Sequence, residues 1–147
     1  MRSDILYILN HLRDEDKAEL IALFGCEWKK RTYNRLKKSN VTVLKDSELR
    51  PFAMGGIEGK KSIACVWLLT TNEIINNKLK LAKEIYEQIA TASKRFEILY
   101  NFIYCSNFQA KRWLKKLGFV FDNPTPKGMD IPDNFEFFYK FTKKEGK

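Results

Sequence analysis

The sequence predicts an α/β (α+β) domain in which a mixed, mostly antiparallel sheet of about six to seven strands is flanked by helices on both faces. Short apolar runs rich in β-branched and aromatic residues alternate with amphipathic segments of helical period. Between residues 41 and 69 the apolar runs are separated by short turns, which favours an antiparallel meander. Further along the chain a strand, a helix and another strand follow one another, which adds crossover connections.

The length of 147 residues fits one domain, which we expect to span residues 1–142 and to be followed by a charged tail at 143–147. No run approaches the roughly 20 apolar residues of a membrane span, and no early segment resembles a signal peptide. Three widely spaced cysteines and a single histidine provide no zinc-ligand set. These features indicate a soluble protein of a reducing compartment.

In the first half of the chain, Ile5–Leu9 predicts a buried strand or the start of a helix. Asp14 can cap a helix that Gly25 ends, and a basic helix follows over Glu27–Lys38. Three strands complete this half, at Val41–Leu44, Phe52–Ile57 and Ser62–Leu69.

The second half opens with a long helix, capped by Thr71 or Asn72, whose apolar positions recur from Ile74 to Ile89. Glu97–Cys105 predicts another buried strand. Asn107 begins a helix that Gly118 ends. The last two strands are expected at Phe119–Phe121 and Phe135–Phe141, on either side of a loop over Asn123–Asn134.

Positive charge is concentrated in two places. The formal net charge of the chain is +9, and the basic residues cluster at Lys29–Lys38 and Lys111–Lys116. Such surfaces favour an anionic partner: nucleic acid, an acidic protein or a phosphorylated cofactor. Solvated helix faces explain the same charges equally well.

The order of elements, together with Asn107-x-x-Ala110-x-x-Trp113-Leu114-x-x-x-Gly118-Phe119, resembles the N-acetyltransferase (GNAT) superfamily over essentially the whole chain. The resemblance implies acetyl-coenzyme A in a V-shaped gap between Ser62–Leu69 and Glu97–Cys105. The residues placed at that cofactor site are Leu68, Leu69, Thr70, Asn76, Asn77, Lys78, Lys80 and Asn107.

A narrower resemblance connects the chain to the small GNAT-like internal virion proteins of short-tailed phages. It is carried by Pro51–Gly56, by Tyr100–Asn107 and by Arg112–Gly118. It implies a phage-encoded protein that resides in the cytoplasm of the bacterial host or is packaged in the virion, with other virion proteins as partners.

Two departures from the superfamily concern its chemistry. Active members place a glycine-rich loop after the third meander strand, where backbone N–H groups approach the cofactor diphosphate. Residues 70–81 of this chain contain no glycine. Asn76 and Asn77, which tolerate left-handed backbone geometry, are the nearest stand-ins, and Lys78 and Lys80 could supply charge.

The second departure concerns proton transfer. The position at which the superfamily carries a tyrosine, the general acid, is Leu114. A positioned acid contributes about 10²–10⁴-fold to a rate, and leucine has no proton to give. Glu58, Glu73 and Asn107 are weak candidates for catalytic residues, because each is explained as a solvated turn, a helix cap or a strand–helix junction.

These features predict a catalytically degenerate GNAT-fold protein that acts as a virion-associated or accessory binding protein, with no metal and no required cofactor. One alternative is an active acetyl-coenzyme A-dependent N-acetyltransferase with a divergent diphosphate loop. The second alternative is an accessory protein that binds nucleic acid through Lys29–Lys38 and Lys111–Lys116.

Overall fold

The computed structural model of the chain describes residues 2–121 and 130–142. It begins with a helical segment that ends before the sheet: α1 (Arg2–Asn10), α2 (Asp14–Phe24), a 3-10 turn η1 (Gly25–Glu27) and α3 (Trp28–Leu36). Gly25 ends α2 as expected, with a φ of +73° that favours glycine. Asp14 is the first residue of α2 rather than its cap, because Arg13 holds the N-cap position.

The sheet has five strands in the described residues, in the order β1-β2-β3-β4-β5. All neighbours are antiparallel except β3 and β4, which run parallel. The strands are β1 (Thr42–Lys45), β2 (Pro51–Lys60), β3 (Ile63–Thr70), β4 (Ile98–Tyr104) and β5 (Phe135–Phe141). The helix α4 (Lys78–Ser93) connects β3 to β4 after a 3-10 turn η2 (Asn72–Asn76), and α5 (Phe108–Lys116) follows β4.

The sheet therefore has one or two strands fewer than the six to seven predicted, whereas its mixed, mostly antiparallel character is confirmed. Ile5–Leu9 lies in α1, where Ile5, Ile8 and Leu9 share one buried face at helical spacing while Leu6 is exposed. Of Phe119–Phe121, only Val120 forms a bridge, to Tyr139 of β5. The run is too short to add a strand.

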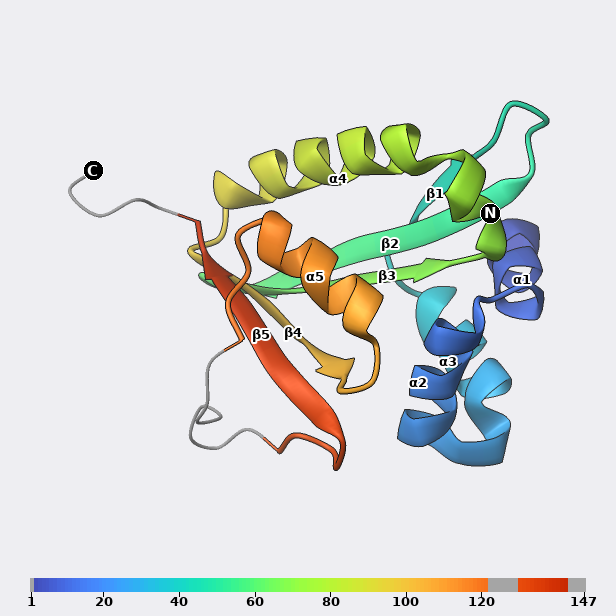
Figure 1. The fold of residues 1–147 in the computed structure, drawn as a ribbon, viewed down its shortest axis with the longest axis horizontal. Helices are drawn as coiled ribbons and strands as arrows, with labels where there is room; N and C mark the ends of the chain where they lie inside the picture. Colours follow the sequence, from blue (N-terminus) through green and yellow to red (C-terminus); the bar gives the residue numbers. More distant parts are fainter. Residues whose placement is uncertain (1, 122–129, 143–147) are drawn as a thin grey trace.

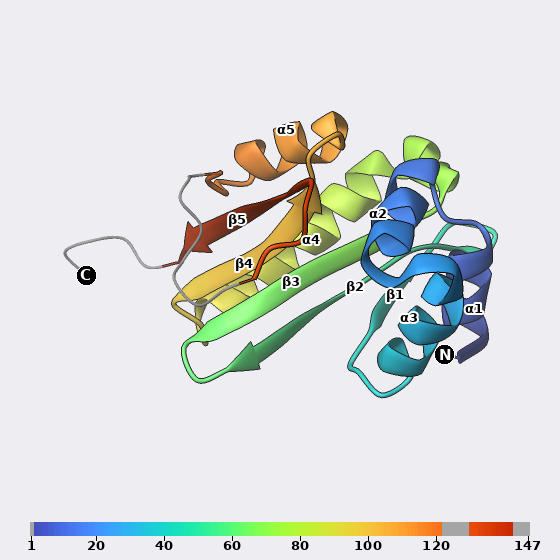
Figure 2. The ribbon, with the colours of Figure 1, turned by 90° about the horizontal axis from the view of Figure 1, so that it is seen from below.

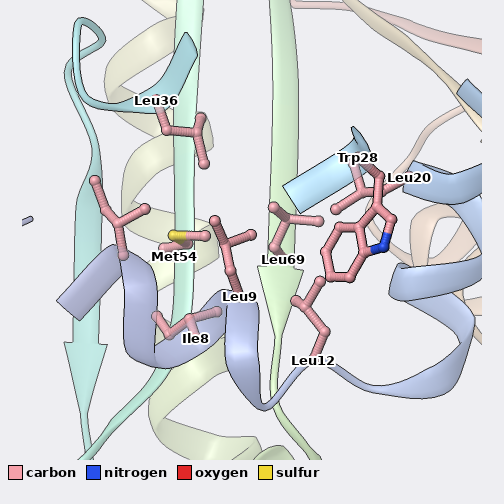
Figure 3. Close-up of a cluster of buried hydrophobic side chains, with 9 residues drawn as sticks. Ile8, Leu9, Leu12, Leu20, Trp28, Leu36, Met54 and Leu69 are labelled. Atoms are coloured by element: carbon pink, nitrogen blue, oxygen red, sulfur yellow. The ribbon is translucent and has the colours of Figure 1, made fainter. Parts of the chain in front are cut away.

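Helices cover both faces of the sheet, as Figures 1 and 2 show. Met54 and Leu69 are paired across β2 and β3 and point toward α1, α2 and α3. That cluster is shown in Figure 3, where Ile8, Leu9, Leu12, Leu20, Trp28 and Leu36 surround the two strand residues. On the opposite face, Ala53 and Leu68 pack with residues of α4 and α5.

Some expectations fall on residues outside the described ones: the tail at 143–147 and positions 123–129 of the loop before β5. Residues 130–134 form neither helix nor strand. In the part of the chain that the structure covers, no helix is long and apolar enough to cross a membrane.

Candidate functional site

The candidate site is the opening between the parallel strands β3 and β4. The two strands pair at Ile63–Ile98, Ala64–Leu99 and Cys65–Tyr100. Beyond these pairs β3 continues to Thr70 and β4 continues to Tyr104, and the two strands no longer pair with each other. The strands therefore diverge into the V-shaped gap that the sequence resemblance implied.

Asn101 lies where the strands begin to separate and bridges the gap. Its Nδ2 donates to the carbonyl oxygen of Val66 on β3 at 2.6 Å. Its Oδ1 accepts from the N–H of Phe102 on its own strand at 2.7 Å. One side chain thus engages a backbone group of each strand.

Two carboxylates of α2 hold the wide end of the gap. Asp16 Oδ2 accepts from the N–H of Thr70 at 2.9 Å and from its hydroxyl at 3.1 Å, and Arg13 NH2 lies 3.3 Å from Asp16 Oδ1. Glu19 Oε1 accepts from the N–H of Tyr104 and from Asn107 Nδ2, both at 3.1 Å. The helix α2 therefore connects the end of β3 to the end of β4.

Burial raises the pKa of both carboxyl groups. Desolvation raises the pKa of Asp16 above its ordinary value, against the opposing effects of Arg13 and the hydrogen bonds from Thr70. Desolvation also raises the pKa of Glu19, although the hydrogen bonds from Asn107 and Tyr104 act in the opposite direction. Neither carboxylate was singled out from the sequence, where Asp16 and Glu19 look like ordinary charges on a solvated helix.

A cleft of about 830 Å³ is lined by residues around the gap and on both sides of the sheet. Its size lies within the usual range for ligand pockets. Its lining combines apolar residues of β3, α4 and α5 with polar residues of α2, α3 and β2. Four buried side-chain atoms without a hydrogen-bond partner in the described structure belong to residues that line it: Arg13 Nε, Thr32 Oγ1, Glu58 Oε1 and Trp67 Nε1.

The segment after β3, where a diphosphate-binding loop was expected, is folded on itself as η2. The side-chain amides of Asn76 and Asn77 both donate to Glu73, to its carboxylate at 3.2 Å and to its carbonyl at 2.8 Å. Asn77 has a φ of −133°, and neither asparagine has a positive φ. The expected left-handed stand-in for the missing glycines is therefore not formed.

Thr71, Lys78 and Lys80, which lie in or next to this segment, cap the turn, begin α4 and bond to β1. Thr71 caps η2 rather than the long helix, because its hydroxyl accepts from the N–H of Glu73 at 3.2 Å. Lys80 donates to the carbonyl of Lys45. Lys78 begins α4 and lines the cleft, and Asn77 makes no side-chain cap to this helix.

The remaining predicted site residues divide between the cleft and the core. Leu68 and Leu114 line the cleft, whereas Leu69 also packs in the core beside α1. Asn107 is the N-cap of α5, as its junction position predicted, and its Oδ1 accepts from the N–H of Ala110 at 3.4 Å. Glu58 lies inside β2 opposite Cys65, not in a solvated turn, and its Oε2 lies 3.7 Å from Arg35 NH2.

The two basic surfaces are both present, and intramolecular contacts use part of each. In α3, Lys29 donates to Asn10, and Arg31 lies over the ring of Phe24. In α5, Lys111 lies 2.7 Å from a carboxylate oxygen of Glu136. Among the described residues, no group of histidine, cysteine and carboxylate side chains could hold a metal ion.

Solved structures of N-acetyltransferases share this architecture. The ribosomal-protein-S18-alanine N-acetyltransferase of Escherichia coli is 14% identical, with a TM-score of 0.68 over 99% of this chain and 90% of the enzyme. A GNAT-family acetyltransferase of Bacillus anthracis is 11% identical, with a TM-score of 0.67 over 98% and 92%. At these identities the likeness establishes the GNAT fold alone.

Sequence comparison gives a narrower result. No curated protein matches the chain. A family model described as "Bacteriophage T7, probable scaffold protein Gp13" matches residues 40–125, from just before β1 to beyond α5. Because the match covers more than half of the 147 residues, the chain belongs to this family of phage proteins.

Proposed function

We propose that the chain is a scaffold-type binding protein of a phage particle, built on a GNAT fold that does not transfer acetyl groups. Residues 1–142 act as one domain in this proposal. The chain works in the cytoplasm of the bacterial host, is packaged in the virion, and has virion proteins as its partners. Its family, described as a probable scaffold protein, supports this assignment.

The observation that carries the proposal is that the chain's own side chains form hydrogen bonds with backbone groups of both strands of the gap. Alternate residues of a strand direct their backbone groups to the same edge, so Val66, Leu68 and Thr70 share the edge that faces β4. The carbonyl of Val66 accepts from Asn101, and the N–H of Thr70 donates to Asp16. On β4, the N–H of Tyr104 donates to Glu19. A cofactor lying between the strands would have to displace these contacts.

The segment after β3 fits a diphosphate no better. Binding through backbone amides requires successive N–H groups in a concave loop. Here η2 is closed by hydrogen bonds to Glu73, whose carboxylate adds negative charge beside the start of α4. The residues present therefore do not fit coenzyme A, and Leu114 lacks a proton for a departing thiolate.

Isothermal titration calorimetry with coenzyme A and acetyl-coenzyme A tests the proposal. We expect no heat of binding at protein concentrations of tens of micromolar. Asn101→Ala and Glu73→Gln are informative variants, since the first frees the Val66 carbonyl and the second removes the negative charge beside α4. Low-micromolar affinity of the unmodified chain, or acetylation of an amine or protein by it, would establish the enzymatic alternative instead.

A separate experiment tests whether the chain is part of the phage particle. Mass spectrometry of purified particles of the phage that encodes the chain should detect it in the assembled virion or in its precursor. Absence of the chain from both would contradict the proposal. Binding to DNA at low salt, with an affinity that falls steeply as salt increases, would instead support the nucleic-acid alternative.

A further inference from the structure

One face of the sheet is aromatic along β4 and β5. Residues directly opposite each other on paired strands share a face, and so do alternate residues of one strand. In the register of β4 with β5 this face runs from the pair Ile98–Phe141 to the pair Tyr104–Phe135, and every position between these pairs carries a phenylalanine or a tyrosine. We call this surface the aromatic face.

The rings on the aromatic face contact one another. The ring of Phe137 on β5 lies 6.0 Å from that of Tyr100 and 5.9 Å from that of Phe102 on β4, measured between centroids. Along β5, the rings of Phe137 and Tyr139 are 5.7 Å apart, and those of Tyr139 and Phe141 are 5.5 Å apart. These separations are typical of aromatic pairs, so the rings form one continuous apolar surface.

This surface is most exposed to solvent at one end. Phe141 is 65% exposed, and Ile63 of β3, directly opposite Ile98, is 41% exposed. Val120, opposite Tyr139 on the outer side of β5, is also 41% exposed. A contiguous apolar patch that extends over several strands marks an interaction site more often than a scattered exposed residue does.

No helix in the described part of the chain packs on the centre of the aromatic face. The buried cluster beneath α1, α2 and α3 takes its buried strand residues from β2 and β3. The helix α5 packs on the other face, where Leu99, Ile103 and Phe138 are buried. Residues 122–129 and 143–147 contain no aromatic residue, and Met129 is their one long apolar side chain. We therefore expect the apolar surface that covers this face to come from another molecule.

Charge favours a second copy of the same chain as that molecule. The charged residues of β5, Glu136 and Lys140, alternate with the aromatic ones and contact Lys111 and the carbonyl oxygen of Leu117 on the opposite side. The aromatic face therefore lacks the lysines and arginines that would attract a nucleic acid or an acidic protein. Two copies, each with a net charge of +9, meet with least repulsion on a surface without cations.

A sheet face with only apolar side chains is also complementary to itself. Two such sheets pack face to face at about 10 Å, with the side chains of one between those of the other. In a two-fold dimer both copies use the same patch, so apolar side chains meet apolar side chains. Aromatic residues and a lack of charge are the features of the buried core of such interfaces.

The size of the face determines the strength that we expect. From Ile98 to Tyr104 the strand advances six residues, about 20 Å, and from β3 across β4 and β5 to Val120 the width is about 15 Å. The outline is therefore about 300 Å², below the roughly 800 Å² per partner of a standard stable interface. We expect a reversible dimer with a dissociation constant on the order of tens of micromolar.

We propose that two copies of the chain associate through the aromatic face, sheet against sheet across a two-fold axis. This inference goes beyond the proposed function, which concerns other virion proteins as partners. It does not depend on that function, because the contact is between identical chains.

Sedimentation equilibrium of the purified full chain tests the proposal between about 5 and about 500 µM, a range that brackets the expected dissociation constant. The weight-average mass should rise from 17.3 kDa toward twice this value as the concentration increases. Higher salt should leave the dimer unchanged or strengthen it, because the contact is apolar and salt screens the repulsion between the positive chains. A monomer at every concentration, or a dimer that dissociates as salt increases, would overturn the proposal.

Phe141→Lys locates the contact, because it places a charge on the aromatic face at an exposed position. The dissociation constant should increase about tenfold or more, since the new charge would be buried without a partner in the dimer. Tyr86→Lys is the matched control: Tyr86 of α4 is also aromatic and is 67% exposed, and the substitution adds the same charge away from this face. It should leave the dissociation constant within about twofold.

Ile63→Lys repeats the test on a second strand, and the melting temperature of each variant shows whether the fold is retained. If Phe141→Lys unfolds the chain, Ile63→Lys decides alone. Equal weakening by Phe141→Lys and Tyr86→Lys would assign the effect to net charge and refute the contact. Association that persists unchanged in both Phe141→Lys and Ile63→Lys would place the interface elsewhere and refute it as well.

Discussion

Replacing Asp16 with alanine should destabilise the chain far more than replacing its neighbour Asp14. Asp16 Oδ2 accepts two hydrogen bonds from Thr70, and Oδ1 lies 3.3 Å from Arg13 NH2. Removal of one partner from a buried charged pair costs about 3–5 kcal/mol. Because alanine also ends the burial of a charge, we expect the lower end of this range, about 3 kcal/mol at pH 7. Asp14 is exposed in the first turn of the same helix, so Asp14→Ala should cost less than about 0.5 kcal/mol.

Urea denaturation followed by tryptophan fluorescence measures both variants, and thermal unfolding gives an independent value. For a chain of this size, a loss of about 3 kcal/mol lowers the melting temperature by roughly 6–12 °C. If the free energies of unfolding of Asp16→Ala and Asp14→Ala agreed within about 1 kcal/mol, α2 would not connect the strands as described.

The pKa of the Asp16 carboxyl group can be tested by comparing the pH dependence of stability between the unmodified chain and Asp16→Asn. The pKa of Asp16 is raised in the folded chain above its ordinary value of 3.8, so the unfolded chain loses this proton first as pH rises. The stability of the unmodified chain should therefore fall, relative to Asp16→Asn, as pH increases above 3.8 through the folded pKa. The opposite slope would mean that Arg13 and Thr70 outweigh burial.

Three further predictions concern other contacts. Glu19→Gln should keep the stability at pH 7 within about 1 kcal/mol, because an amide oxygen still accepts from Tyr104, whereas Glu19→Leu leaves two donors unpaired and should cost about 2–3 kcal/mol in urea denaturation. Gly59→Ala should cost about 1–3 kcal/mol in the same assay, because a Cβ there would lie 2.1 Å from the buried ring of Phe96. Burial raises the pKa of the Cys65 thiol to about 11, so mass spectrometry after iodoacetamide treatment at pH 8 should find the exposed Cys26 alkylated first, and comparable rates would contradict this.

Much of the fold follows from local patterns in the sequence. The meander strands and the helix that begins at Asn107 have period and turn chemistry strong enough to fix their type, and Gly25 and Gly118 end their helices at positive φ. The N-terminal run Ile5–Leu9 was ambiguous, because five apolar residues suit a buried strand as well as a helix. What decides it is packing of Ile8 and Leu9 against Met54, a contact about 45 residues away in the sequence.

The site was less accessible to sequence reasoning. The gap between β3 and β4 was expected, and so were the loss of the glycine-rich loop and Leu114. The residues that occupy the gap were not, because Asp16, Glu19 and Asn101 form no spacing pattern with their partners. Asp16 contacts Thr70 across 54 positions and Glu19 contacts Asn107 across 88. Such contacts exist only once α2 has docked on the sheet.

The pairing of these polar groups has a common physical cause. Two diverging parallel strands expose backbone N–H and C=O groups that a buried structure must satisfy. In this chain Asn101 donates a hydrogen bond to a backbone carbonyl at the narrow end of the gap. Asp16 and Glu19 accept hydrogen bonds from backbone N–H groups at the wide end. The carboxylates are desolvated as a result, which is why their pKa values are raised. A ligand that entered between the strands would therefore have to displace these side-chain contacts.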